Sequence, residues 1–103
     1  MPEHAVGQLS AIPVGKGCAV EIGGEAIAVF HMPGGQVRAV SAACTHKGGP
    51  LAQGRVAGSL VICPLHLQTF DLNTGRSTCG QPDLTVYPAR VDESGTVQIS
   101  VAG

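Results

Sequence analysis

Aromatic and charged side chains are both scarce in this chain. It has no Trp, one Tyr and two Phe among 103 residues, and its six basic and seven acidic side chains leave a formal net charge of −1. The core must therefore be built mainly from Val, Ile, Leu and Ala. The near-neutral balance argues against a nucleic-acid-binding patch and against a polybasic membrane anchor.

Several other features are missing as well. The sequence has no run of about 18 apolar residues, so we expect no membrane span. Residues 1–4 show no basic region leading into an apolar stretch, so we expect no secretory signal and a cytoplasmic location. There is no Ser/His/Asp set, carboxylate pair or phosphate loop to indicate a catalytic site. The length predicts a single domain, residues 1–103, with a modest core.

No stretch of ten residues shows a helical period, whereas turn-forming residues are abundant, with 15 Gly and 7 Pro. The pattern predicts an all-β fold: an antiparallel β sandwich or partly open barrel with two loops at one end. The predicted strands cover residues 18–22, 25–31, 36–41, 59–63, 69–72, 84–91 and 96–101. Pro88 lies inside the sixth of these and should reduce part of it to a sheet edge.

Two short Cys/His pairs carry the chemistry. Cys44 and His46 form the first pair, Cys63 and His66 the second, and residues 47–62 separate them. Two Cys and two His are the ligand set of a Rieske [2Fe–2S] centre, in which His replaces Cys on one of the two irons. In a chain without a secretory signal, Cys residues indicate metal ligands or free thiols before disulfides. We therefore predict one [2Fe–2S] cluster per chain, held by these four residues.

A structural zinc site is the main alternative, because zinc can use the same four side chains. Zinc sites tend to pair Cys with Cys and His with His at short spacing, so two mixed pairs favour iron–sulfur. The surrounding residues fit a cluster loop. Gly48, Gly49 and Pro50 supply bent backbone after the first pair, and Pro64 fixes a bend within the second. The zinc alternative would make the chain a non-redox interaction module.

These residues resemble the Rieske family, and the resemblance runs from about Val29 to Tyr87. Residues 44–51 (CTHKGGPL) look like the family's first box. Residues 63–66 (CPLH), followed by Phe70-Asp71 and Thr74-Gly75, look like its second. The size is similar to that of the ferredoxins of aromatic-ring dioxygenases and of the small subunit of assimilatory NAD(P)H nitrite reductases. The resemblance implies a three-layered β fold in which the cluster loops cap one end and the His ligands reach the surface.

The resemblance also implies a function. Cys44 and Cys63 would hold the inner ferric iron, and His46 and His66 the outer iron, which is the one reduced. As a ferredoxin, the chain would be a non-catalytic one-electron carrier between an NAD(P)H- or flavin-dependent reductase and a terminal oxygenase. As a nitrite reductase small subunit, it would be a stable component bound to a large subunit.

Some positions depart from the family pattern. Leu67 stands where the family usually has Gly. Gly49 and Leu65 stand where high-potential members carry two disulfide-forming Cys. Gln68 and Phe70 stand where those members place Ser and Tyr hydroxyls near the cluster. Fewer hydroxyl donors should leave the reduced state less stabilised, so we expect a potential near the lower end of the Rieske range, about −150 mV.

The remaining Cys, His and Asp candidates are assigned structural roles. We expect Cys18 to be a small buried hydrophobe in a strand and Cys79 to be a free thiol in a loop. His4 and His31 have no ligand partner at short spacing and are expected to be ordinary surface residues. Asp71 is expected to cap a turn.

Overall fold

The computed structural model describes residues 3–42, 51–62, 69–78 and 84–101. Within these ranges the regular structure consists of strands and two short 3-10 segments, which confirms the all-β prediction. In chain order the elements are β1 (Glu3–Gln8), η1 (Leu9–Ala11), β2 (Gly17–Ile22), β3 (Glu25–Met32), β4 (Gln36–Ser41), η2 (Leu51–Gln53), β5 (Arg55–Ala57), β6 (Leu60–Ile62), β7 (Thr69–Asp71), β8 (Val86–Tyr87), β9 (Ala89–Val91) and β10 (Thr96–Ser100).

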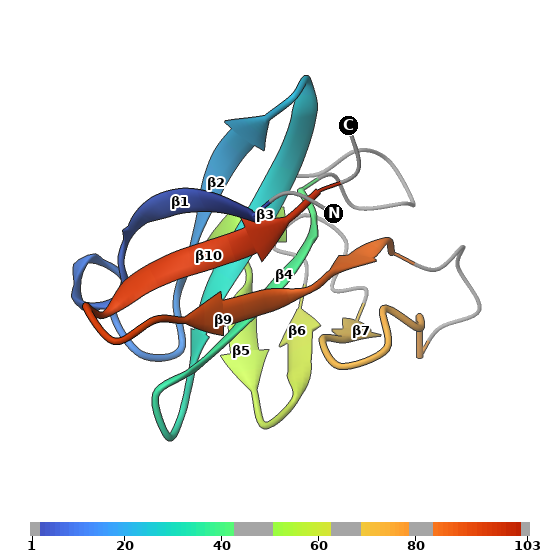
Figure 1. Cartoon of the computed structure of the whole chain (residues 1–103). Helices are drawn as coiled ribbons and strands as arrows, with labels where there is room; N and C mark the ends of the chain where they lie inside the picture. Colours follow the sequence, from blue (N-terminus) through green and yellow to red (C-terminus); the bar gives the residue numbers. More distant parts are fainter. Residues whose placement is uncertain (1–2, 43–50, 63–68, 79–83, 102–103) are drawn as a thin grey trace.

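The strands form three antiparallel sheets, ordered β1-β10-β9, β2-β3-β4-β8 and β5-β6-β7. Figure 1 shows the first of these sheets in front of the second, with β5 and β6 on the far side. The sheets are open and stacked in layers rather than closed into one barrel. This agrees with the sandwich-like, three-layered arrangement expected from the sequence.

The middle sheet has a hydrophobic cluster on each face, because side chains alternate along a strand. In β3, Ala28 and Phe30 belong to one cluster, and Ile27 and Val29 to the other. The first cluster, on the side of β5-β6-β7, contains Ala28, Phe30, Met32, Val40, Ala52, Val61, Phe70, Leu72 and Leu84. The second cluster, toward β1-β10-β9, contains Ile12, Ile22, Ile27, Val29, Val37, Ala39, Val97, Ile99 and Val101.

The β2–β3–β4 meander forms where the sequence predicted it. Gly23 and Gly24 join β2 to β3 with φ angles of 57° and 83°, which are the positive values that a tight hairpin turn requires. Pro33, Gly34 and Gly35 make the next turn. The register is regular along both hairpins, so the alternation read from the sequence places the apolar side chains correctly.

The predicted strand 84–91 is divided at Pro88. β8 pairs with β4 in the middle sheet, whereas β9 pairs with β10 in the front sheet. Pro88 has no N–H to donate, but its carbonyl accepts a hydrogen bond from the Ser100 N–H at 2.9 Å. The proline is therefore the point at which the chain passes from one sheet to the next.

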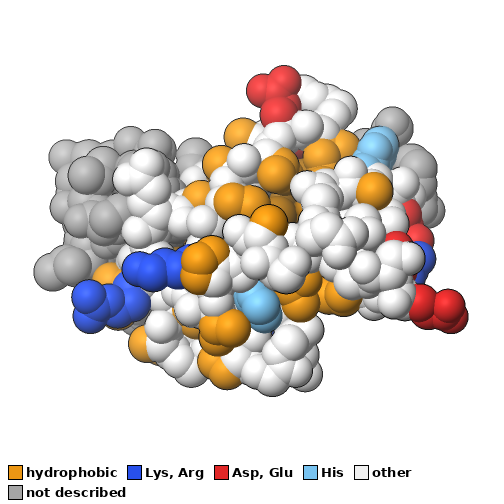
Figure 2. All heavy atoms as spheres, turned by 90° about the vertical axis from the view of Figure 1, so that its left-hand side faces the viewer, with side chains coloured by type: hydrophobic (Ala, Val, Ile, Leu, Met, Phe, Trp, Pro, Cys, Tyr) orange, Lys and Arg blue, Asp and Glu red, His pale blue; other side chains and the backbone are white. Residues whose placement is uncertain are grey.

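Neither positive nor negative side chains dominate the face that Figure 2 shows. Lys and Arg side chains lie mainly at one end of this face, Asp and Glu lie at the top and the opposite end, and hydrophobic side chains lie between them. Across the described ranges, we find no helix with the length and hydropathy needed to span a membrane.

Candidate metal centre

The four predicted ligands, Cys44, His46, Cys63 and His66, lie outside the described residues. Their neighbours in the chain are described, and these show how the two ligand-bearing segments are attached. We call residues 43–50 the first ligand segment and residues 63–68 the second. Each segment leaves a strand and returns to a regular element, so its two ends are fixed by identifiable contacts.

The first ligand segment begins directly after β4, where the chain is held on both sides. The Ala42 N–H donates to the Ala26 carbonyl at 3.0 Å. The Ser41 N–H donates to the Thr85 carbonyl at 2.9 Å, and the Ser41 hydroxyl accepts from the Thr85 N–H at 3.2 Å. Backbone hydrogen bonds on both flanks fix the point from which the segment departs.

The first ligand segment ends at η2. Ala52, in the middle of this 3-10 turn, is buried and belongs to the same cluster as Phe30. The short turn is therefore anchored by apolar packing against the middle sheet, and it returns the chain to the core before β5 begins.

The second ligand segment joins two paired strands. Ile62, the last residue of β6, pairs with Thr69, the first residue of β7. Beyond β7, the Thr78 N–H donates to the Thr69 carbonyl at 3.0 Å, and the Thr69 and Thr78 hydroxyls are in hydrogen-bond contact. The predicted ligands Cys63 and His66 thus lie on the connection of one hairpin whose base is closed on both sides.

The bases of both ligand segments meet in the first hydrophobic cluster. Ala42 packs against this cluster from the start of the first segment, and Ala52 enters it from the end. Val61 and Phe70 enter it from the strands that bracket the second segment, and both are completely buried. The described residues that flank the two Cys/His pairs in sequence therefore belong to one hydrophobic core.

A series of backbone hydrogen bonds also connects β7, next to the second ligand segment, with β4, next to the first. The Gly75 N–H donates to the Asp71 carbonyl at 2.6 Å, and the Leu84 N–H donates to the Gly75 carbonyl at 2.7 Å. Leu84 precedes Thr85, which is bonded to Ser41 at the start of the first ligand segment. The end of β7 and the end of β4 are thus held together by main-chain contacts.

The donor set fits a Rieske-type cluster, because two thiolates and two imidazoles supply the mixed ligation that one thiolate-bound and one imidazole-bound iron need. Among the described residues, no group of three or more His, Cys, Asp or Glu side chains could hold a metal ion. This part of the chain therefore offers no competing metal site.

Asp71 behaves as the sequence predicted. Its Oδ1 accepts a hydrogen bond from the Asn73 N–H at 2.8 Å, which makes an Asx turn after β7. Cys18 is a half-buried free thiol packed against the second cluster, and burial raises the pKa of its thiol. Both residues therefore have structural roles. Cys79 lies outside the described residues.

His31 differs from its expected surface role. It is half-buried, and its Nδ1 is 2.5 Å from the Ile12 carbonyl oxygen, to which the ring donates. Its backbone also exchanges hydrogen bonds with Gly15 and Lys16. His31 therefore ties the loop before β2 to β3. The contact spans 19 positions of sequence, so no local pattern could have indicated it.

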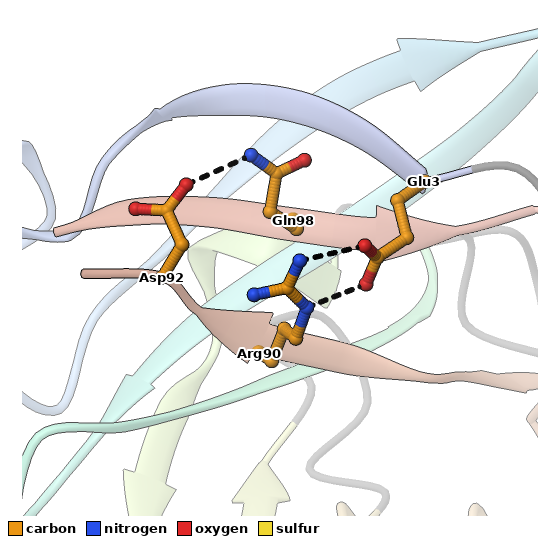
Figure 3. Close-up of polar contacts among 4 residues, drawn as sticks. All are labelled: Glu3, Arg90, Asp92 and Gln98. Atoms are coloured by element: carbon orange, nitrogen blue, oxygen red, sulfur yellow. Dashed lines mark hydrogen bonds and ion pairs between the residues drawn. The ribbon is translucent and has the colours of Figure 1, made fainter. Parts of the chain in front are cut away.

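An ion pair and a charge-assisted hydrogen bond lie on the front sheet. Arg90 binds Glu3 through two hydrogen bonds of 2.7 Å, and Gln98 donates to Asp92 at 3.1 Å (Figure 3). The hydrogen bond from Arg90 lowers the pKa of Glu3, and that from Gln98, aided by backbone N–H groups, lowers the pKa of Asp92. These pairs connect β1, β9 and β10, so they stabilise the sheet rather than the ligand segments.

Comparison with known proteins agrees with this geometry. The sequence model of the Rieske [2Fe-2S] domain family matches residues 3–88. A ferredoxin component of the naphthalene 1,2-dioxygenase/salicylate 5-hydroxylase systems of Ralstonia sp. is 31% identical over 86 residues, which cover 82% of each chain. The chain belongs to the Rieske [2Fe-2S] domain family, and its cofactor is a Rieske-type [2Fe–2S] cluster rather than the zinc ion considered above.

Two kinds of small Rieske protein are among the similar solved structures. A candidate NADH-dependent nitrite reductase small subunit from Mycobacterium tuberculosis is 26% identical with a TM-score of 0.91, covering 99% of this chain and 97% of that one. The ferredoxin–oxygenase complex of carbazole 1,9a-dioxygenase includes a chain that is 28% identical with a TM-score of 0.83, covering 94% of this chain and all of that one.

Proposed function

We propose that this chain is a single-domain electron carrier, residues 1–103, without a catalytic centre of its own, acting in the cytoplasm. The four ligands in this proposal are Cys44, His46, Cys63 and His66. When bound, the cluster supplies a one-electron ferric/ferrous couple. The observation that carries the proposal is that both ligand segments are anchored in one hydrophobic cluster, next to a donor set of two Cys and two His.

The chain's residues would perform distinct tasks in this role. The Cys44 and Cys63 thiolates bind the inner iron, and the His46 and His66 imidazoles bind the outer iron. Phe70 contributes an apolar ring at the base of the second segment, where it offers no hydroxyl donor. We therefore propose a reduction potential near the lower end of the Rieske range.

Spectroscopy of protein purified without oxygen tests the ligand assignment. The wild type should show Rieske-type visible absorption and, after reduction, a Rieske-type EPR signal. His46→Cys and His66→Cys should each keep iron but lose the Rieske g values, because thiolate replaces imidazole on the outer iron. His4→Cys is the control and should change neither spectrum. A colourless, zinc-containing wild type would refute the assignment.

The favoured partner pair is a flavin- or NAD(P)H-dependent reductase and a terminal oxygenase. The identity of 31% to a dioxygenase ferredoxin component and the likeness to a ferredoxin–oxygenase complex support this choice. Interfaces between electron carriers and their partners are small and transient, so the chain should elute separately from both partners in gel filtration.

A nitrite reductase small subunit is the second candidate, favoured by the TM-score of 0.91 over nearly the whole chain. In that case a tagged chain, recovered from its own host, should bring with it a stoichiometric sirohaem protein. Recovery of the chain alone, together with electron delivery to an oxygenase, would decide for the ferredoxin.

A further inference from the structure

Gly17 occupies a place where a side chain has no room. It is the first residue of β2 and pairs with Phe30 of β3. A Cβ at this position would lie 2.7 Å from both Cδ1 and Cε1 of Phe30, and 2.9 Å from the carbonyl oxygen of Ala52. Both approaches are closer than real Cβ contacts, so the strand, the ring or η2 would have to move.

Backbone conformation does not explain the glycine. Gly17 lies in a β-strand and is not among the glycines of positive φ, so alanine could adopt its main-chain angles. By contrast Gly15, two residues earlier, has a φ of 81° and no neighbouring atom near its missing Cβ. At position 17 the absence of a side chain serves packing alone.

The close approach of Gly17 to Ala52 lies in η2, where the chain returns from the first ligand segment. η2 begins at Leu51, directly after residues 43–50, which contain the predicted ligands Cys44 and His46. Ala52 is buried beside Phe30 in the first cluster. The depth at which Ala52 settles against the middle sheet therefore determines where the segment rejoins the core.

We propose that Gly17 is a positioning residue for the iron–sulfur centre. Its missing side chain lets η2 settle against Phe30 and so fixes the end of the segment that carries Cys44 and His46. The inference rests on the proposed function, because it concerns the same four ligands. Residues that orient metal ligands without binding the metal commonly change the metal affinity when they are mutated. A mutation at Gly17 should therefore have a measurable effect on the iron–sulfur centre.

Gly17→Ala, compared with Val97→Ala, tests this role in the cluster-loaded protein. Val97 is completely buried in the second hydrophobic cluster, which contains no residue of η2, β6 or β7, so its truncation destabilises the fold without touching η2. We expect Gly17→Ala to lose visible cluster absorbance to an iron chelator roughly tenfold faster than the wild type, and to shift the EPR g values. Val97→Ala should lower the melting temperature but keep the wild-type g values and chelation rate.

Equal chelation rates and equal g values in the two variants would overturn the proposal. If Gly17→Ala does not accumulate as folded protein, the double variant G17A/F30L removes the ring edge and is compared with Phe30→Leu alone under the same criteria. A wild type without a Rieske EPR signal would refute the proposed function. A normal wild type with an unaffected Gly17→Ala would refute only the role of Gly17.

Discussion

Phe70 stands where high-potential Rieske proteins are expected to place a Tyr hydroxyl, and its ring is fully buried. We expect Phe70→Tyr to raise the potential, because a hydroxyl donated toward a cluster sulfur stabilises the reduced, more negative state. Protein-film voltammetry measures the shift. Phe70→Leu is the control, since it also disturbs the fully buried ring but adds no donor. If the potential of Phe70→Tyr shifts no more than that of Phe70→Leu, position 70 does not face the iron–sulfur cluster.

Asp92 should give the fold part of its pH dependence. Its pKa is lowered by the Gln98 side chain and by the backbone N–H groups of Thr96 and Ser94, relative to a usual value of 3.8. A lowered folded-state pKa means that the stabilisation is fully present above the unfolded value and is lost as the pH falls through the folded value.

We therefore expect Asp92→Asn to melt below the wild type at pH 7, with the difference shrinking as the pH falls below 3.8 and through the lowered pKa of Asp92. Far-UV circular dichroism suits the measurement, since the chain has no Trp. Glu93→Gln is the control, because no hydrogen bond to the Glu93 side chain is recorded within the described part of the chain. A constant difference between wild type and Asp92→Asn across the pH range would contradict the prediction.

Individual residues were predictable from the sequence where their role is local. Asp71 bonds to a backbone group two residues away, so a turn motif was enough to assign it. His31 and Gly17 depend on contacts with segments far along the chain, and periodicity carries no information about those. The ligand assignment came from the motif, because all four predicted ligands lie outside the described residues, and the burial of Ala52, Val61 and Phe70 in one hydrophobic cluster supports it.

Among the elements, the turn after β7 should be sensitive because it links the bases of the two ligand segments. A Cβ on Gly75 would collide with the Leu84 carbonyl oxygen and would lie 2.9 Å from Cγ2 of Val86. Gly75 also has a φ of 79°. Gly34 has a similar φ of 89° but nothing within 4 Å of its missing Cβ, so it separates the cost of conformation from the cost of contact.

Urea unfolding of Gly34→Ala and Gly75→Ala measures this difference. Gly34→Ala should cost about 1–2 kcal/mol, which is the penalty of a left-handed conformation. Gly75→Ala should cost a further ~1–3 kcal/mol, because the collision with backbone cannot be relieved by a rotamer change. Equal losses in the two variants would mean that the turn and the Leu84 segment can separate freely.

The elements that were predicted well are those joined by clear turns. β2, β3 and β4 are connected by glycine turns and their side chains alternate regularly. β1 was missed because its EHAVGQ sequence is polar and its pairing with β10 is irregular between Ala5 and Gly7. β5 was missed because three residues between two glycines are too short to show a period. Pro88 was recognised as a disruption, but the transfer of the chain to another sheet depends on β10, which follows later.

For the whole molecule, removal of the iron–sulfur cluster should affect the two hydrophobic clusters unequally. Metal binding contributes to folding free energy, so chelation should lower the melting temperature. Hydrogen exchange should accelerate in η2, β6 and β7, whose residues belong to the first cluster. The β1-β10 pair belongs to the second cluster and should keep its protection. Uniform acceleration in all strands would show that the molecule unfolds as one unit on losing iron.

β3 forms the wall between these two halves, since its alternate side chains enter opposite clusters. Protein engineers could therefore exchange residues 43–50 and 63–68 for loops with other donor atoms while leaving the front sheet unaltered as a rigid base. In the same way, natural divergence could retune such a centre by rewriting two short stretches of gene. The front sheet would keep its architecture through every such exchange.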